Sequence, residues 1–181
     1  AYFYPDGKPL PVGFLRTNPD YAATLRAVAE RGPEAFYTGP VAAAIVERAR
    51  QAPRPGAITT EDIASYRAVL RDAVCAPYRA YRVCSVPPPS SGVALLQTLG
   101  LVERFAPAGA TNDPAGWGAF IDAMQLAYAD RDHYVGDGDF VDVPVAGLID
   151  PRYWQARAKA RPTPGATAAP GDPGAAGRTG R

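Results

Sequence analysis

The sequence predicts an α+β fold that is mostly helical and contains a single β-hairpin. Side chains that cap helix N-termini precede apolar-periodic segments at several places along the chain. Apolar and β-branched residues flank the dipeptide Arg79-Ala80, which is the pattern of a tight hairpin turn. Residues 87–89 are three prolines, which cannot donate ladder hydrogen bonds, so the second strand must end there.

An extended, proline-punctuated segment over residues 1–16 precedes the first predicted helix. Asn18 is suited to the N-cap of that helix, with Pro19 at its first position. We expect the helix to run to about Arg31 and to stop at Gly32, where the apolar periodicity ends.

Two further helices are predicted before the hairpin. The first runs from Val41 to about Ala52, directly after a Gly-Pro pair. The second is short: Thr59 and Asp62 form a variant capping box, and the helix ends near Tyr66.

The hairpin is predicted from strands over Val69–Val74 and Arg82–Val86. With a two-residue turn at 79–80, Cys75 lies opposite Cys84 at a non-hydrogen-bonded position, where Cα atoms approach to about 4.5 Å. The two cysteines either form a cross-strand disulfide or pack side by side as free thiols. The disulfide is less expected in a cytosol than in an oxidising compartment, and both states stay open.

The C-terminal half is predicted to be helical, with a flexible tail. Three helices follow capping side chains: Gly92 to about Phe105 after Ser90 and Ser91, Pro114 to about Tyr134 after Asp113, and Arg152 to about Arg161 after Asp150. Residues 1–161 are therefore predicted to be ordered, whereas the Pro/Gly/Ala-rich residues 162–181 are predicted to be disordered. Because two strands alone make no stable sheet, we expect exposed apolar surface on the chain.

Composition excludes several classes of partner. The net charge is +1 over 181 residues, with acidic and basic residues interspersed, which argues against a nucleic-acid or membrane-surface footprint. No apolar run approaches the roughly 20 residues that cross a bilayer. One histidine and two cysteines do not complete a tetrahedral metal site.

Five segments resemble one known family, in the same order. Residues 74–92, VCAPYRAYRVCSVPPPSSG, resemble the P-V-C-x-P-Y-R-G-Y-x-V-C-x-x-P-P-P-S-S-G-G segment of bacterial γ-glutamyltransferases. The other segments are LRTNPDYAATLR at 15–26, GPEAFYTG at 32–39, ITTEDIASY at 58–66, and AYADR at 127–131 followed by GDGDFVDVPV at 136–145. The sequence departs from the family at Ala80 and Val93, where the family has glycine.

The resemblance implies part of an αββα sandwich of the N-terminal-nucleophile hydrolase type. In that family a precursor cuts itself, and the new N-terminal threonine of the small subunit is the nucleophile, with its own amino group as base. The chain resembles only the C-terminal part of the large subunit, so we expect it to be an internal fragment with no catalytic residue. Its substrate-binding residues stay unknown, and the resemblance implies no cofactor and no metal.

The implied activity is transfer of the γ-glutamyl group of glutathione-like amides to amino acids, peptides or water. The implied partners are the rest of the large subunit and the small catalytic subunit, in a periplasmic or secreted enzyme. We expect the isolated chain to be inactive. A cephalosporin or glutaryl acylase of the same family is the alternative, and a non-catalytic helical interaction module is another.

Several polar residues have a structural interpretation. We expect His133 to lie at a surface or helix end, and Asp130 and Arg131 to form an ion-pair network that fixes loop 136–144. Ser90 and Ser91 lack a neighbouring base and are interpreted as helix caps. Four aspartates lack the EF-hand pattern of a calcium loop: Asp132, Asp137, Asp139 and Asp142.

Overall fold

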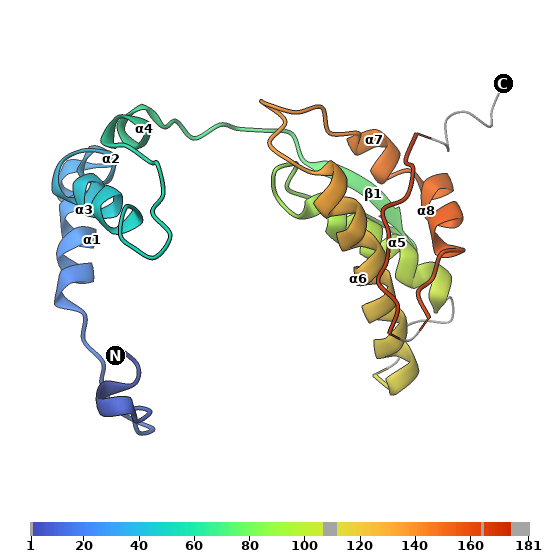
Figure 1. The fold of residues 1–181 in the computed structure, drawn as a ribbon, viewed down its shortest axis with the longest axis horizontal. Helices are drawn as coiled ribbons and strands as arrows, with labels where there is room; N and C mark the ends of the chain where they lie inside the picture. The colour runs from blue at the N-terminus through green and yellow to red at the C-terminus, as the bar shows by residue number, and fades with distance from the viewer. Residues whose placement is uncertain (1, 107–111, 164, 175–181) are drawn as a thin grey trace. The chain divides into compact units, whose positions relative to one another are not determined.

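The computed structural model describes residues 2–106, 112–163 and 165–174, and its chain divides into two compact units (Figure 1). We call residues 1–69 the N-terminal unit and residues 70–181 the C-terminal unit. The boundary lies inside the stretch 1–161 that the sequence predicts as one domain. Val69 and Leu70, on the two sides of the boundary, are both exposed.

The N-terminal unit is helical in its described residues. Its elements are η1 (Pro5–Gly7), α1 (Pro19–Arg31), α2 (Glu34–Tyr37), α3 (Gly39–Ala49) and α4 (Thr60–Ser65). The α1 bounds confirm the prediction, and the Asn18 side chain accepts a hydrogen bond from the backbone N–H of Tyr21 at 3.0 Å. The sequence did not predict α2, which is a single turn of helix.

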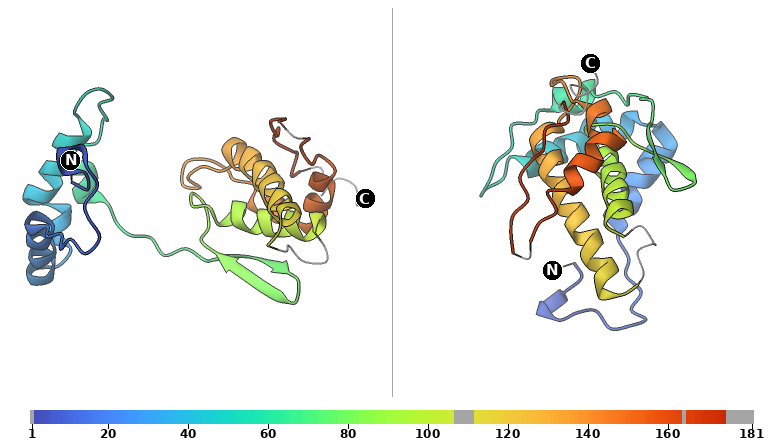
Figure 2. Two further views of the ribbon diagram at one scale, coloured as in Figure 1. Left: turned by 90° about the horizontal axis from the view of Figure 1, so that it is seen from below. Right: turned by 90° about the vertical axis from the view of Figure 1, so that its right-hand side faces the viewer.

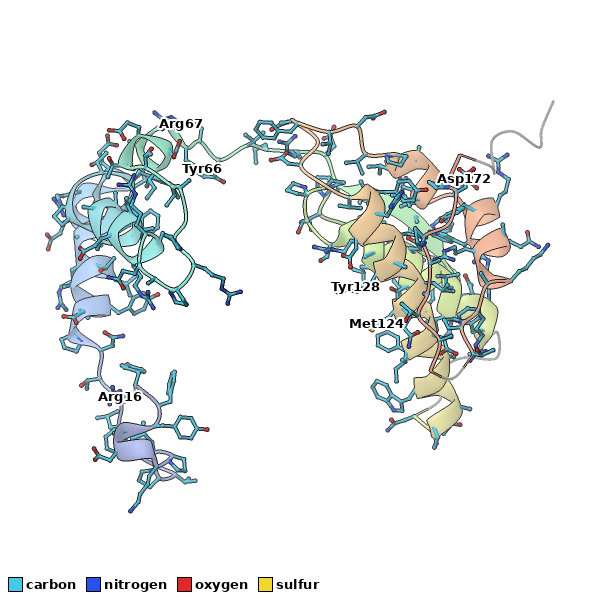
Figure 3. The ribbon with its side chains drawn as sticks, in the orientation of Figure 1. Arg16, Tyr66, Arg67, Met124, Tyr128 and Asp172 are labelled. Atoms are coloured by element: carbon cyan, nitrogen blue, oxygen red, sulfur yellow. A yellow bond between two sulfur atoms is a disulfide. The ribbon has the colours of Figure 1, made fainter. Side chains whose placement is uncertain are left out.

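The two other predicted helices of this unit are present. The capping box of α4 is complete, since Thr59 and Asp62 each accept a hydrogen bond from the other's backbone N–H. The α3 helix ends at Ala49 rather than near Ala52, because Pro53 disfavours helical geometry in the residue before it. Arg67, labelled in Figure 3, donates from Nη1 to the carbonyls of Ala64 and Tyr66 at 2.8 Å and closes α4.

The C-terminal unit combines the hairpin with helices. Its elements are β1 (Val74–Tyr78), β2 (Tyr81–Ser85), α5 (Gly92–Phe105), α6 (Pro114–Tyr134), α7 (Val145–Leu148) and α8 (Pro151–Ala158). The α5 and α6 bounds confirm the predictions, and α8 ends a little earlier than expected. The one-turn helix α7 was not predicted.

The hairpin has the predicted register. The strands pair antiparallel with Tyr78 opposite Tyr81 and Cys75 opposite Cys84. The predicted position of the first strand, Val69–Val74, was wrong, because the strand continues to the turn and begins only at Val74. Pairing with β2 decides where β1 lies, whereas residues 69–73 pair with no strand in the described part of the chain.

The α5 helix is the centre of the C-terminal unit. It contacts the hairpin, α6 and α8, and Figure 2 shows α5 between the hairpin and α6. This central position explains why its sequence is apolar nearly all round rather than on one stripe. The core around it contains Leu96, Leu101, Leu126, Leu148 and Trp154.

The tail packs on this unit up to Gly174. In Figure 1 the dark red segment runs beside α6 and α8, and the Tyr134 hydroxyl donates to the carbonyl of Gly171 at 2.6 Å. The sequence-based expectation that residues 162–181 are disordered stays a prediction. The contacts of residues 165–174 are made through backbone hydrogen bonds, which a composition rich in proline, glycine and alanine does not reveal. The predicted disorder of residues 164 and 175–181 lies outside the described residues.

Among the residues that the structure describes, none of the helices has both the length and the apolar character that a bilayer crossing requires.

Candidate functional site

The carboxylate of Asp130 is the main polar group inside the C-terminal unit, and it is fully buried. Its Oδ2 accepts hydrogen bonds from the Tyr153 hydroxyl at 2.7 Å, from Nε of Arg157 at 3.1 Å and from Nε2 of Gln97. Its Oδ1 accepts from the backbone N–H of Gly171 at 2.7 Å. We call these five residues the Asp130 hub.

Three helices and the tail bring the hub together. Asp130 lies on the buried face of α6, three and four residues after Ala127 and Leu126. Tyr153 and Arg157 are four residues apart on α8, so they project from the same face. Gln97 is buried in the middle of α5 and donates from there to Asp130 on α6. The hub therefore joins α5, α6 and α8.

The hub holds an ion pair away from water. The side chains of Asp130 and Arg157 are 0% and 5% exposed, a situation that requires further hydrogen bonds to offset desolvation. Arg157 supplies two of these by donating from Nη2 to the carbonyls of Leu126, at 3.3 Å, and Ala169. Both charges are thereby surrounded by partners.

Tyr153 is kept in its protonated form by the hub. Burial, and then the hydrogen bond to Asp130, raise the pKa of Tyr153 far above its usual value of about 10. Gln97 donates to the same carboxylate, which fixes the orientation of its amide because an ionised carboxylate only accepts. Among the described residues, the Oε1 atom of Gln97 has no hydrogen-bond partner.

The hub is built to hold structure in place. Its carboxylate accepts four hydrogen bonds, three at Oδ2 and one at Oδ1, all from groups of this chain. In the described part of the chain no hydrogen bond joins a serine, threonine or cysteine side chain to this carboxylate or to His133, whose ring lies edge-on to Tyr134. The sequence-based expectation that the chain supplies no catalytic residue stays a prediction.

The structure divides the predicted Asp130–Arg131 network. Asp130 points inward to the hub, whereas Arg131 pairs with the exposed Asp132 at 2.7 Å. Neither holds loop 136–144 as the sequence suggested. That loop is bound instead by an ion pair between Arg71 and Asp139, at 2.5 Å, and the hydrogen bond to Arg71 lowers the pKa of Asp139.

Two further sequence-based interpretations concern the cap of α5 and metal binding. Ser91 is the N-cap residue of α5, but its side chain makes no capping hydrogen bond, so the expected hydroxyl cap was wrong. Within the described residues, no three of the His, Cys, Asp and Glu side chains are grouped to hold a metal ion.

A surface cleft of about 680 Å³ adjoins the Arg71 ion pair and is lined by residues of three segments: Arg71, Asp72, Pro87, Pro88, Gly138, Phe140, Val141, Asp142, Val143 and Val145.

The hairpin contains a covalent link. The sequence left two states open for Cys75 and Cys84, and in the structure a disulfide joins them, with Cα atoms 4.1 Å apart. At the turn, Arg79 rather than Ala80 adopts positive φ, at 53°. The backbone N–H of Arg79 donates to Oε1 of Glu103 at 3.1 Å, which attaches the turn to α5.

Comparison with known proteins gives the family. The sequence profile of gamma-glutamyltranspeptidase matches residues 1–173. The chain is 39% identical over 161 residues to the glutathione hydrolase proenzyme of Escherichia coli strain K12, and 37% over 160 residues to the acylase ACY 1 proenzyme of Pseudomonas sp. strain SE83. These alignments each cover 84% of this chain but only 26% and 27% of those proteins.

Solved structures give the same result. Helicobacter pylori gamma-glutamyltranspeptidase matches with a TM-score of 0.71 at 35% identity, over 94% of this chain and 50% of that one. The cephalosporin acylase of Bacillus halodurans matches with a TM-score of 0.73 at 31% identity, over 95% of this chain and 32% of that one. The chain belongs to the gamma-glutamyltranspeptidase family, and the predicted fold class is confirmed. It spans about a quarter of the length of the curated relatives named above.

Proposed function

We propose that this chain is the C-terminal part of the large subunit of a self-cleaving γ-glutamyltransferase, or glutathione hydrolase. The observation that carries the proposal is the 39% identity to a glutathione hydrolase proenzyme along most of the chain. Relatives described as proenzymes support a precursor that is processed into two subunits.

The chemistry would take place on a threonine outside this chain. Its hydroxyl attacks the γ-amide carbonyl of a glutathione-like donor, its own amino group takes the proton, and the donor's amine leaves with that proton. An amino acid, a peptide or water then attacks the resulting ester and releases the enzyme. Backbone N–H groups would stabilise the tetrahedral oxyanion.

The role of this chain would be architectural. One face of α6 carries apolar side chains that the C-terminal unit covers only in part, with Met124 half-buried and the others exposed: Trp117, Phe120, Ile121, Met124 and Tyr128. Figure 3 shows Met124 and Tyr128 projecting from the same side of that helix. Their spacing of three, four and seven residues is that of a helix face that packs against a neighbour. We infer that this face receives another part of the same precursor.

The compartment is proposed to be oxidising, that is, periplasmic or extracellular. The Cys75–Cys84 disulfide supports this, because such bonds persist mainly outside the cytosol.

The test is turnover of γ-glutamyl-p-nitroanilide by the full-length precursor after processing. Glutaryl-p-nitroanilide is the matched control, because it differs only in lacking the α-amino group. We expect release of p-nitroaniline from the γ-glutamyl compound by the processed enzyme, and none by the isolated 181-residue chain. Preferential turnover of the glutaryl compound would instead indicate an acylase, the activity for which two of the relatives are named.

A further inference from the structure

Residues 165–174, which we call the strap, are held to the helices through backbone groups. The N–H of Gly171 donates to Asp130, and the C=O of Gly171 accepts from the Tyr134 hydroxyl at 2.6 Å. The C=O of Ala169 accepts from Arg157. Both hydrogen-bonding groups of Gly171 and one of Ala169 are thus engaged by side chains of α6 and α8.

The position of Gly171 admits no side chain. A Cβ added there would overlap the hydroxyl of Tyr153 and lie 2.9 Å from Cδ of Arg157. Further along, Pro173 lies against Gly147, where an added Cβ would be 2.9 Å from the Pro173 carbonyl oxygen. The strap is therefore seated in one register, because a shift by one residue would place a side chain against Tyr153.

We propose that Asp130 is a positioning residue that fixes the strap, and thereby fixes the point from which the precursor chain runs on toward its self-cleavage bond. The positioning role rests on the proposed function. Simple stabilisation does not require such a hub, since apolar residues of similar volume often replace a buried ion pair without loss of stability. What the hub adds is recognition of particular backbone groups in a segment with little to bury.

The physical effect is a restriction of the chain's search. A segment anchored at Gly171 can reach at most about 3.3–3.6 Å farther for each following residue, whereas release of the anchor adds all the residues back to the end of α8. Holding reacting groups within reach raises the rate of an intramolecular step, and loosening the tether lowers it.

The first experiment measures backbone hydrogen exchange of the 181-residue chain by mass spectrometry. Gly171→Ala displaces the strap and leaves the charges of Asp130 and Arg157 in place, whereas Gly138→Ala is the matched control, because its Cβ meets nothing within 4 Å. We expect exchange in peptides spanning 165–174 to rise at least tenfold in G171A and not in G138A. Equal exchange in wild type and G171A would overturn the strap assignment.

The second experiment follows self-cleavage of the full-length precursor by gel electrophoresis. We expect Gly171→Ala and Asp130→Asn to slow cleavage at least tenfold. Asp130→Asn leaves Arg157 without its counter-charge and can therefore unfold the unit. G171A and Tyr134→Phe avoid this problem, because Tyr134→Phe removes only one hydrogen bond to the strap. Both of these variants should also slow cleavage.

The kinetics of the processed enzyme distinguish a positioning role from a merely structural one. Once cleaved, G171A should have wild-type kcat and KM for γ-glutamyl-p-nitroanilide, because the strap acts before that chemistry. The positioning role would be refuted if G171A cleaved at the wild-type rate although hydrogen exchange showed a loosened strap. It would also be refuted if turnover by processed G171A fell by the same factor as the cleavage rate. A wild-type precursor that never cleaves would refute the proposed function and the positioning role. The exchange experiment would still test whether the strap is held to the helices.

Discussion

Gly100 of α5 lies directly against the indole ring of Trp154 on α8. A Cβ added at Gly100 would overlap the Cε3 and Cζ3 atoms of that ring. The indole cannot move aside, because Trp154 is 1% exposed and its Nε1 donates to the carbonyl of Leu148 at 2.8 Å. The contact between α5 and α8 therefore depends on the absence of a side chain at position 100.

We expect Gly100→Ala to destabilise the C-terminal unit by about 1–3 kcal/mol, the usual effect of overfilling a packed core. Gly118→Ala is the matched control, because it also lies inside a helix and its Cβ would meet nothing within 4 Å. There, helix propensity predicts a gain of up to about 1 kcal/mol. Urea unfolding followed by circular dichroism measures both, and a stabilised G100A would contradict the packing argument.

The Cys75–Cys84 disulfide should stabilise the hairpin. By the chain-entropy estimate, a link across so short a loop contributes about 2–3 kcal/mol. We expect Cys75→Ser/Cys84→Ser to lower the free energy of unfolding by up to that amount under oxidising conditions and not at all in reductant. Ellman's reagent on the unreduced, denatured protein should find no free thiol; two reactive thiols would show that the bond is absent.

Asp150 caps α8, accepting from the backbone N–H of Arg152 at 2.8 Å and pairing with its side chain. We expect Asp150→Ala to cost about 1 kcal/mol at neutral pH. The hydrogen bond from Arg152 lowers the pKa of Asp150, so this stabilisation is complete above the unfolded-state pKa of 3.8 and is lost as pH falls through the folded-state pKa.

Asp150→Asn separates the two contributions. Asparagine caps helices about as well as aspartate but carries no charge, so D150N should retain most of the stability and lose the acid dependence. Unfolding midpoints between pH 2 and 7 measure the effect. An acid transition in D150N as large as the wild-type one would assign the dependence to other carboxylates.

Tyr153 should stay protonated in the folded protein well above pH 10, since burial and Asp130 raise its pKa. A raised pKa favours the fold below the unfolded-state value of about 10, and this contribution declines as pH rises beyond it. Tyr153→Phe should therefore leave the absorbance titration of the folded protein at 295 nm unchanged. A loss of signal in Y153F would show that the hub is open to solvent.

Local signals predicted much of the fold. The caps at Asn18, Thr59, Asp113 and Asp150 all form, because a capping side chain bonds to backbone within three residues of itself. The hairpin register followed from its two-residue turn, since an antiparallel pairing is determined once the turn is known. The position of the first strand did not follow, because a strand needs a partner.

The hub could be predicted only in part. The AYADR segment drew attention to Asp130, but Tyr153 and Arg157 gave no signal, because nothing in an amphipathic helix says which distant carboxylate its polar side chains meet. Gln97, a polar residue inside an apolar run, was the one available hint.

The sequence by itself determined the family, the order of the longer helices and the position of Cys75 opposite Cys84, since these depend on residues near one another along the chain. Only the tertiary structure decided that a buried carboxylate joins α5, α6 and α8 and that the strap is hydrogen-bonded to it. The reason is that burial and hydrogen bonding between distant residues arise only when the helices pack. Asp130 and Gly171, for example, are hydrogen-bonded although they are 41 positions apart in the sequence.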